Sequence, residues 1–122
     1  MVTGAPVSAD DALAEVYAQI PAVGCRGLCW RSCGPVDCGD RERERLAEAG
    51  VVLPPAAEAV AAGSMCPALS PYGRCTVYAV RPAVCRLWGA AAAMPCPHGC
   101  RPAGGLLPDA RARRLLAEAS RL

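Results

Sequence analysis

Nine cysteines in a chain of 122 residues constrain this fold more than any other feature of its sequence. Three of them lie in the central stretch from Cys66 to Cys85, four precede it and two follow it. A chain of this length forms one domain, residues 1–122, with a modest hydrophobic core. The core is poor in large side chains, because Phe is absent and only two Trp and three Tyr occur. We therefore expect the cysteines to hold the fold together, either as disulfides or as metal ligands.

The cellular compartment decides between disulfides and metal ligands. The first 20 residues lack a basic start and an apolar run, and Asp10, Asp11 and Glu15 fall where a signal peptide would be hydrophobic. No segment has the apolar length of a membrane span. We expect a cytoplasmic protein, whose thiols stay reduced or bind metal. An odd number of cysteines also fits a closed set of disulfides badly.

The net charge of +2 indicates no strong preference for a charged partner. All basic side chains are Arg, and the charges alternate in sign along Arg41–Arg45, which is typical of a solvent-exposed helix face. We expect neither a nucleic-acid nor a membrane partner. An unidentified protein partner stays open.

Apolar periodicity and capping residues predict helices at both ends of the chain. Residues 9–20 form an amphipathic pattern that begins after Ser8 as N-cap and ends at Pro21. A second pattern over 108–122 places Leu115, Ala119 and Leu122 on one face. Both helices are expected to pack against the core motif, residues 25–100.

Shorter elements are predicted between these helices. Asp40 is expected to cap a helix over residues 41–49 that stops at Gly50, and an Ala-rich helix runs from Pro54 to about Gly63. Residues 76–80 have the composition of a short strand. Pro82 then opens a helical turn that ends at Gly89, and residues 96–100 form a tight loop. The fold class is a small, mainly α, metal-stapled domain with irregular cysteine-rich loops and at most one short strand or hairpin.

Metal binding requires deprotonated thiols that converge within a few ångströms. Cys25, Cys29 and Cys33 recur every fourth residue and would project from one side of a helix. Cys85 falls in the first turn of the helix that Pro82 opens, where unpaired N–H groups are expected to lower the pKa of its thiol. The candidate ligands are Cys25, Cys29, Cys33, Cys66, Cys75, Cys85, Cys96 and Cys100.

Two further residues are additional candidates. Cys38 is a possible surplus thiol, because two four-ligand sites need eight cysteines. His98 is the only histidine and lies between Cys96 and Cys100, where it is either a ligand or an ordinary surface residue. Arginines flank the cysteines more often than chance predicts, which suggests thiolate stabilisation, although ordinary surface arginines explain it equally well. They are Arg26, Arg74, Arg86 and Arg101.

The spacing of the cysteines favours an iron–sulfur cluster, of the 4Fe–4S type, slightly over Zn²⁺. Structural zinc sites commonly use pairs of cysteines two to four residues apart, and the two-residue gap is absent here. Iron–sulfur clusters use cysteine alone, and a Cys-Pro step occurs in one of their known ligand runs. Such steps occur here at Cys66 and Cys96. Zinc stays open.

Three consecutive motifs resemble a known family. The segments Cys66–Leu69, Cys75–Tyr78 and Arg81–Arg86 read C-x-x-L, C-x-V-Y and R-P-x-x-C-R. In this they are similar to the YkgJ-type cysteine-cluster family, a zinc- or iron-chelating domain that also carries an N-terminal cysteine cluster. The likeness covers about half the chain, and the N-terminal cluster departs from the family pattern because it has no adjacent pair of cysteines. A distant relation exists to the cysteine cluster of flagellin lysine N-methylases.

The resemblance implies a metal or iron–sulfur centre, with three motif residues close to the ligands: Tyr78, Arg81 and Arg86. The first functional hypothesis is a metal-binding module with a structural or sensing role. The alternative is an iron–sulfur-dependent redox enzyme, or a methylase-like accessory protein that acts with a partner. A thiol-redox protein without metal is a third hypothesis. Whether the chain is an enzyme stays open, since neither a G-x-G-x-x-G motif nor a carboxylate pair is evident.

Overall fold

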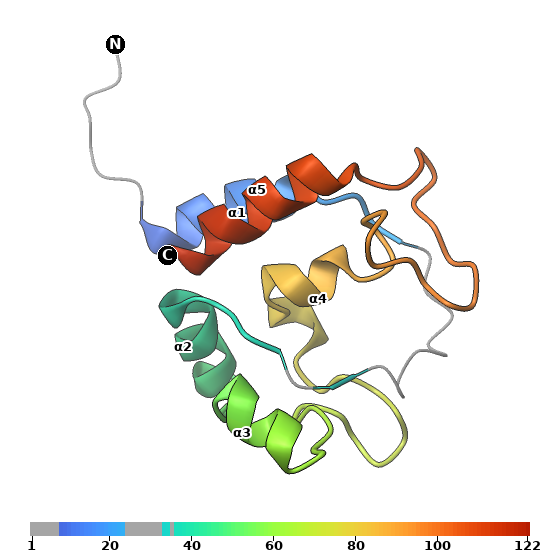
Figure 1. Cartoon of the computed structure of the whole chain (residues 1–122). Coiled ribbons are helices and arrows are strands. Elements are labelled where there is room, and N and C mark those ends of the chain that lie inside the picture. Colours follow the sequence, from blue (N-terminus) through green and yellow to red (C-terminus); the bar gives the residue numbers. More distant parts are fainter. Residues whose placement is uncertain (1–7, 24–32, 35) are drawn as a thin grey trace.

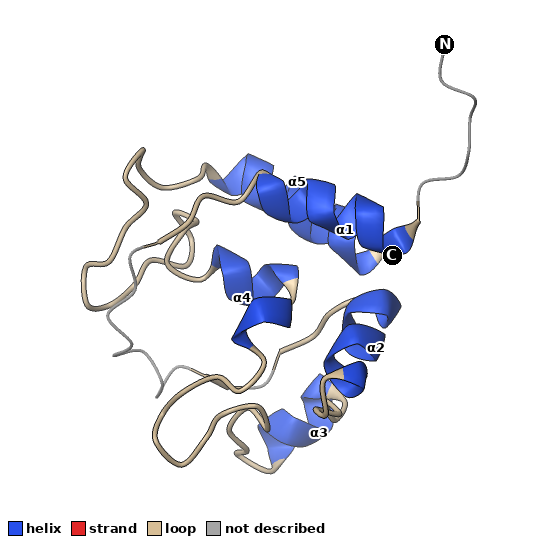
Figure 2. Ribbon diagram, turned by 180° about the vertical axis from the view of Figure 1, so that it is seen from behind, coloured by secondary structure: helices blue, strands red, loops and turns tan. Residues whose placement is uncertain are grey.

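Two terminal helices, α1 (Ala9–Ala18) and α5 (Asp109–Ser120), lie side by side in the computed structural model, and the short helix α4 (Ala83–Leu87) packs against both (Figure 1). The structure describes residues 8–23, 33–34 and 36–122. Helices α2 (Asp40–Glu48) and α3 (Ala56–Ala61) lie on the other side of α4, and long loops connect the elements (Figure 2). The prediction of a small, mainly α fold with irregular loops is confirmed.

Helix α1 begins as the sequence predicts. The Ser8 side chain accepts a hydrogen bond from the backbone N–H of Asp11 at 3.0 Å, which satisfies one of the unpaired donors of the first turn. The helix ends at Ala18, two residues earlier than expected, and its buried side chains are Leu13 and Val16.

The predicted apolar face of the last helix is also confirmed. Leu115 and Ala119 are buried in one cluster with Leu13, Val16 and Ala83, and Leu122 packs against this cluster. This core joins α1, α5 and the beginning of α4.

Helix α2 differs from its prediction in two ways. Its N-cap is Gly39 rather than Asp40. A Cβ atom at Gly39 would lie 2.7 Å from the backbone oxygen of Ala119, so only glycine allows α2 to approach the end of α5 this closely. The expectation that Arg41–Arg45 is a solvated face is wrong for Glu42, whose exposed fraction is 3%.

The end of α2 and the short helix α3 agree with the sequence. Gly50 follows α2 with a φ of +96°, a left-handed conformation that terminates helices. Gly63 terminates α3 in the same way, with a φ of +63°. Leu46 of α2 is buried with Val51, Ala68 and Val77 in a second apolar cluster.

The short strand predicted over residues 76–80 is wrong. Tyr78–Val80 forms a 3₁₀ turn, η2, in which the N–H of Arg81 donates to the carbonyl of Tyr78. The described residues contain only two isolated β-bridges, Leu69–Cys75 and Ala91–Leu107. A segment rich in β-branched residues becomes a strand only where a neighbouring strand pairs with it. Here Val77 packs into the second cluster instead.

Helix α4 begins one residue later than predicted, because Pro82 is its N-cap. Gly89 follows the helix with a φ of +79°, as expected for a helix stop. Within the described residues, no helix combines the length and apolar character needed to cross a membrane.

Candidate metal centre

Cys85 occupies the first turn of α4, which confirms its predicted location. Its N–H donates to the carbonyl of Pro82 at 3.0 Å, and the residue is half-buried. The preceding proline and the buried Ala83 fix where this turn starts. The thiol is therefore carried by a helical turn that is anchored in the core.

Three other thiols act electrostatically on Cys85. Burial first, and then the negative charges that Cys66, Cys75 and Cys33 carry when ionised, raise the pKa of the Cys85 thiol to about 12. Arg81 opposes this shift. The expectation of a lowered pKa is wrong, because desolvation and like charges outweigh the favourable effect of the helix start. We call Cys33, Cys66, Cys75 and Cys85 the four-thiol group.

Backbone hydrogen bonds bring the segments of this group together. The N–H of Cys66 donates to the carbonyl of Cys33 at 2.8 Å, which joins two segments far apart in the sequence. The loop between Cys66 and Cys75 closes through the Leu69–Cys75 bridge and through Thr76, whose N–H and hydroxyl both donate to the carbonyl of Ala68. Cys66, Cys75 and Cys85 are free thiols.

The four-thiol group has the type of donor atoms that a metal needs, but not the distances between them. Four cysteine sulfurs are the donor set that zinc and iron–sulfur clusters prefer, and a cation relieves the repulsion between neighbouring thiolates. As the described residues are placed, however, no three Cys, His, Asp or Glu side chains come close enough to hold a metal ion. Binding therefore requires the sulfurs to draw together.

Cys38 lies in different electrostatic surroundings. Burial and the charge of Glu42 raise the pKa of its thiol to about 11, while Arg43 opposes the rise. Its N–H donates to the carboxylate of Asp37 at 3.0 Å. Cys38 packs on the same apolar cluster as Cys66 and Cys75, so it is a neighbour of the four-thiol group that faces other charges.

The loop Cys96–Cys100 is tight, as predicted. The N–H of Gly99 donates to the carbonyl of Cys96 at 3.1 Å, and Gly99 has a φ of +81°. The N–H of His98 donates to the sulfur of Cys96 at 3.4 Å. His98 is exposed and Cys100 is buried.

Cys96 lies beside the end of α4. A Cβ atom built at Gly89 would be 3.6 Å from Cβ of Cys96 and 3.7 Å from Cγ1 of Val23. The remaining candidate ligands, Cys25 and Cys29, lie outside the described residues, as does Arg26.

The three motif residues expected near the ligands behave differently from one another. Arg81 acts on Cys85 and stacks on the exposed ring of Tyr78, with its guanidinium carbon 3.7 Å from the ring centroid. Arg86 stacks on Tyr17 at 3.8 Å and donates from Nε to the carbonyl of Arg81 at 2.7 Å. Arg86 therefore holds the backbone around Cys85.

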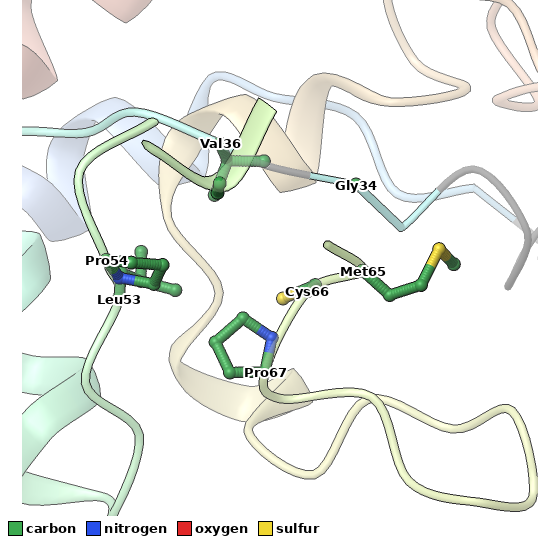
Figure 3. A pocket seen from close by; sticks show the side chains of 8 residues that line it. Gly34, Val36, Leu53, Pro54, Met65, Cys66 and Pro67 are labelled. Carbon is green, nitrogen blue, oxygen red and sulfur yellow. The ribbon is translucent and has the colours of Figure 1, made fainter. Parts of the chain in front are cut away.

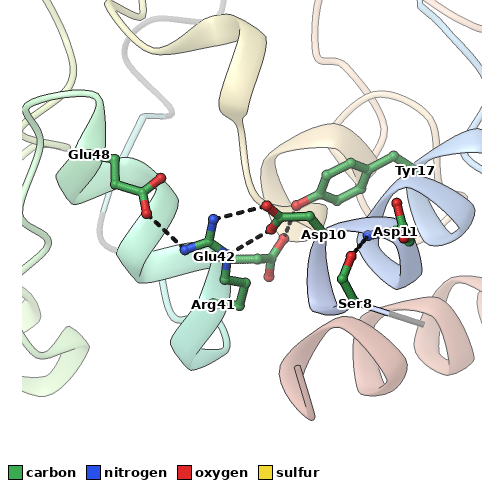
Figure 4. A network of polar contacts seen from close by, with 7 residues as sticks. All are labelled: Ser8, Asp10, Asp11, Tyr17, Arg41, Glu42 and Glu48. Carbon is green, nitrogen blue, oxygen red and sulfur yellow. Dashed lines mark hydrogen bonds and ion pairs between the residues drawn. The ribbon is translucent and has the colours of Figure 1, made fainter. Parts of the chain in front are cut away.

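Sequence reasoning missed Glu42 as part of this region. Its Oε2 atom accepts hydrogen bonds from the Tyr17 hydroxyl and from the N–H of Ala83, both at 2.6 Å. Figure 4 shows Glu42 pointing toward Tyr17, while Arg41 on the same helix bridges Asp10 and Glu48 at the surface. Nothing in the alternating charges of α2 distinguishes Glu42 from its exposed neighbours.

A small apolar pocket adjoins Cys66 (Figure 3). The room inside it is about 10 Å³, roughly the space of one water molecule, and its lining includes Val36, Leu53, Pro54, Met65 and Pro67. The lining contains no charged side chain. This volume lies below the range of roughly 300–1,000 Å³ that is usual for small-molecule sites.

Comparison with known proteins gives one match. The family model CxxCxxCC, described as "Putative zinc- or iron-chelating domain", matches residues 24–113, which is most of the chain. No curated protein and no solved structure matches.

Proposed function

This chain belongs to the CxxCxxCC family of zinc- or iron-chelating domains, and we propose that it binds its metal through Cys33, Cys66, Cys75 and Cys85. The observation that carries the proposal is the backbone hydrogen bond from Cys66 to Cys33, together with the packing of Cys66 and Cys75 on one apolar cluster. The charges of these three thiols also act on Cys85. Four segments separated along the chain supply one sulfur each. A metal that displaces the protons of these thiols would bind them as thiolates.

An iron–sulfur cluster of the 4Fe–4S type is the proposed centre, with Zn²⁺ as the competing metal. Both accept four sulfur ligands. The all-cysteine character of the four-thiol group and the Cys-Pro step at Cys66 support the cluster. The exposed His98 lies outside this group, in the loop Cys96–Cys100.

A structural or sensing role is proposed for this centre. Cys66 and Cys75 of the four-thiol group pack on an apolar cluster of four buried residues, Leu46, Val51, Ala68 and Val77. A centre that ties four segments together would supply cohesion that so small a core lacks. The small volume of the pocket beside Cys66 supports the same role, since it offers little room for a substrate.

The alternative, a redox enzyme or a methylase-like accessory protein, has one observation in its favour. The same pocket borders Cys66 and has an apolar lining. An enzyme of this kind would require a partner to complete its substrate site.

The other candidate ligands remain predictions. Cys96 and Cys100, with Cys25 and Cys29, would form a second four-sulfur set. Cys38 and His98 would be additional ligands only if one of these sets is incomplete.

Anaerobic purification followed by analysis for iron, zinc and sulfide tests the proposal. We expect iron and sulfide in equal amounts and a visible absorption that dithionite bleaches. Zinc without sulfide would favour the competing metal while keeping the ligands. A chain that holds no metal after anaerobic reconstitution with iron and sulfide, or with zinc, would contradict the proposal.

A further inference from the structure

Glu42 is the only fully buried charged residue in the part of the chain that the structure describes. Burying a carboxylate is costly unless hydrogen bonds compensate it. Two donors converge on its Oε2 atom, the Tyr17 hydroxyl of α1 and the N–H of Ala83 in α4. One carboxylate of α2 therefore ties three helices together.

The hydrogen bond to Ala83 supplies an acceptor that α4 otherwise lacks. The first N–H groups of a helix have no partner within the helix, and the N-cap of α4 is Pro82, which offers no side-chain acceptor. Glu42 provides this acceptor from 41 residues away in the sequence. It thereby fixes the first turn of α4 relative to α2.

Tyr17 of α1 also contacts α4 at Arg86, the residue that follows Cys85. The guanidinium of Arg86 lies 3.8 Å from the centroid of the Tyr17 ring. Arg86 also donates to the carbonyls of Arg81 and Ala79, at 2.7 and 3.1 Å, and so holds the turn that precedes α4. The two anchored residues, Ala83 and Arg86, bracket Cys85 in the sequence.

We propose that Glu42 is a positioning residue of the metal centre, which, through Ala83 and with Tyr17 and Arg86, fixes the direction in which α4 presents the Cys85 thiol. This inference rests on the proposed function. Ligand groups must be held within about 0.5 Å of their productive positions, and a five-residue helix cannot secure this by itself. Glu42 supplies the missing constraint without touching the metal.

The test is an anaerobic titration of the metal-free full-length protein with Co²⁺, whose absorption reports thiolate coordination. We expect Glu42→Ala to weaken Co²⁺ binding by about 10- to 100-fold, as partners of metal ligands commonly do, and to alter the sulfur-to-cobalt charge-transfer bands. Glu42→Gln keeps an oxygen that can accept from Ala83, so it should lose less affinity than Glu42→Ala.

Two control variants separate positioning from general stability. Ser8→Ala removes the N-cap of α1, and Asp10→Asn breaks the surface ion pair with Arg41 that also joins α1 to α2. Both positions are exposed and away from α4, so both variants should leave the cobalt spectrum unchanged. If Glu42→Ala matches Ser8→Ala in affinity and spectrum, the positioning role is wrong.

If Glu42→Ala fails to fold, Glu42→Gln and Tyr17→Phe carry the test. Tyr17→Phe removes one donor to Glu42 but keeps the ring on which Arg86 stacks. We expect a several-fold weaker affinity and a shifted spectrum for each. Wild-type affinity and spectrum in both variants would overturn the inference.

Alkylation of the metal-free protein distinguishes this inference from the proposed function. The rate at Cys85, followed by mass spectrometry with Cys100 as internal reference, should rise in Glu42→Gln and Tyr17→Phe. If the wild-type chain binds no metal but Cys85 responds in this way, the proposed function fails, while Glu42 is still shown to fix the position of the Cys85 thiol. An unchanged Cys85 rate in both variants contradicts the positioning role.

Discussion

The four-thiol group and the loop Cys96–Cys100 present cysteines in opposite ways. In the first, cysteines from separate segments lie near enough to Cys85 to raise the pKa of its thiol, and two of them pack on the second apolar cluster. In the second, two cysteines lie four positions apart in a tight turn that Gly99 closes. The first group exists only once the chain has folded, whereas the second is nearly complete in its local sequence.

This difference has an energetic consequence. Sulfurs that meet across long sequence separations close large loops, so a metal bound there removes much freedom from the unfolded chain. A metal that binds Cys96 and Cys100 closes only a short loop, so it removes little freedom from the unfolded chain. We therefore expect the four-thiol group to control folding, and the loop to affect mainly its own surroundings.

Cys85→Ser should have the largest effect. We expect metal affinity to fall by more than the roughly 100-fold loss that is typical of residues next to ligands, because a ligand itself is removed. The fold should become sensitive to protease. Metal content and limited proteolysis measure both effects, with Cys75→Ser expected to behave alike and Cys38→Ser to matter less. Unchanged metal content in Cys85→Ser would remove this residue from the ligand set.

The double variant Cys96→Ser/Cys100→Ser should have a smaller effect that sharpens the comparison. We expect the metal of the four-thiol group to remain and the helical circular dichroism to persist, because α1, α4 and α5 pack without the loop. Elemental analysis per chain measures the difference from the wild type. Loss of all metal in this variant would mean that the two regions form one site.

Gly39→Ala should destabilise the fold by about 1–3 kcal/mol, the usual cost of overpacking. The new Cβ would meet the backbone oxygen of Ala119 at 2.7 Å and force α2 away from α5. Urea unfolding of the metal-free protein measures the change. Gly104→Ala is the matched control, because a Cβ there meets nothing within 4 Å. Equal stability of the two variants would contradict the close packing of α2 against α5.

The last expected effect is a pH dependence of the metal-free protein, which is absent at neutral pH and confined to alkaline conditions. The folded state raises the pKa of Cys85 from 9.0 to about 12, so the unfolded chain loses this proton first as the pH increases. Stability should therefore fall between about pH 9 and pH 12, and Cys38, whose pKa is raised to about 11, should contribute in the same direction. Cys85→Ser should reduce the slope of unfolding free energy against pH in this range. An unchanged slope would mean that Cys85 is not buried among other thiols.

Local signals in the sequence were sufficient for the start of one helix and the stops of three. Ser8 caps α1, and Gly50, Gly63 and Gly89 adopt the left-handed conformations expected after α2, α3 and α4. These signals succeed because a cap or a helix stop depends on a few neighbouring residues. The three consecutive motifs from Cys66 to Arg86 were likewise sufficient for the family.

By itself, the sequence determined the mainly α fold class, the cap of α1, the glycine stops of three helices and the abundance of thiols without enough apolar side chains to replace them. Only the tertiary structure decided which thiols share surroundings, why Gly39 must be glycine, and that residues 78–80 form a turn instead of a strand. It also decided that Glu42, within a run of alternating charges, enters the interior to hold α4. Each of these depends on contacts between residues far apart in the chain, and such contacts leave no periodic trace in the sequence.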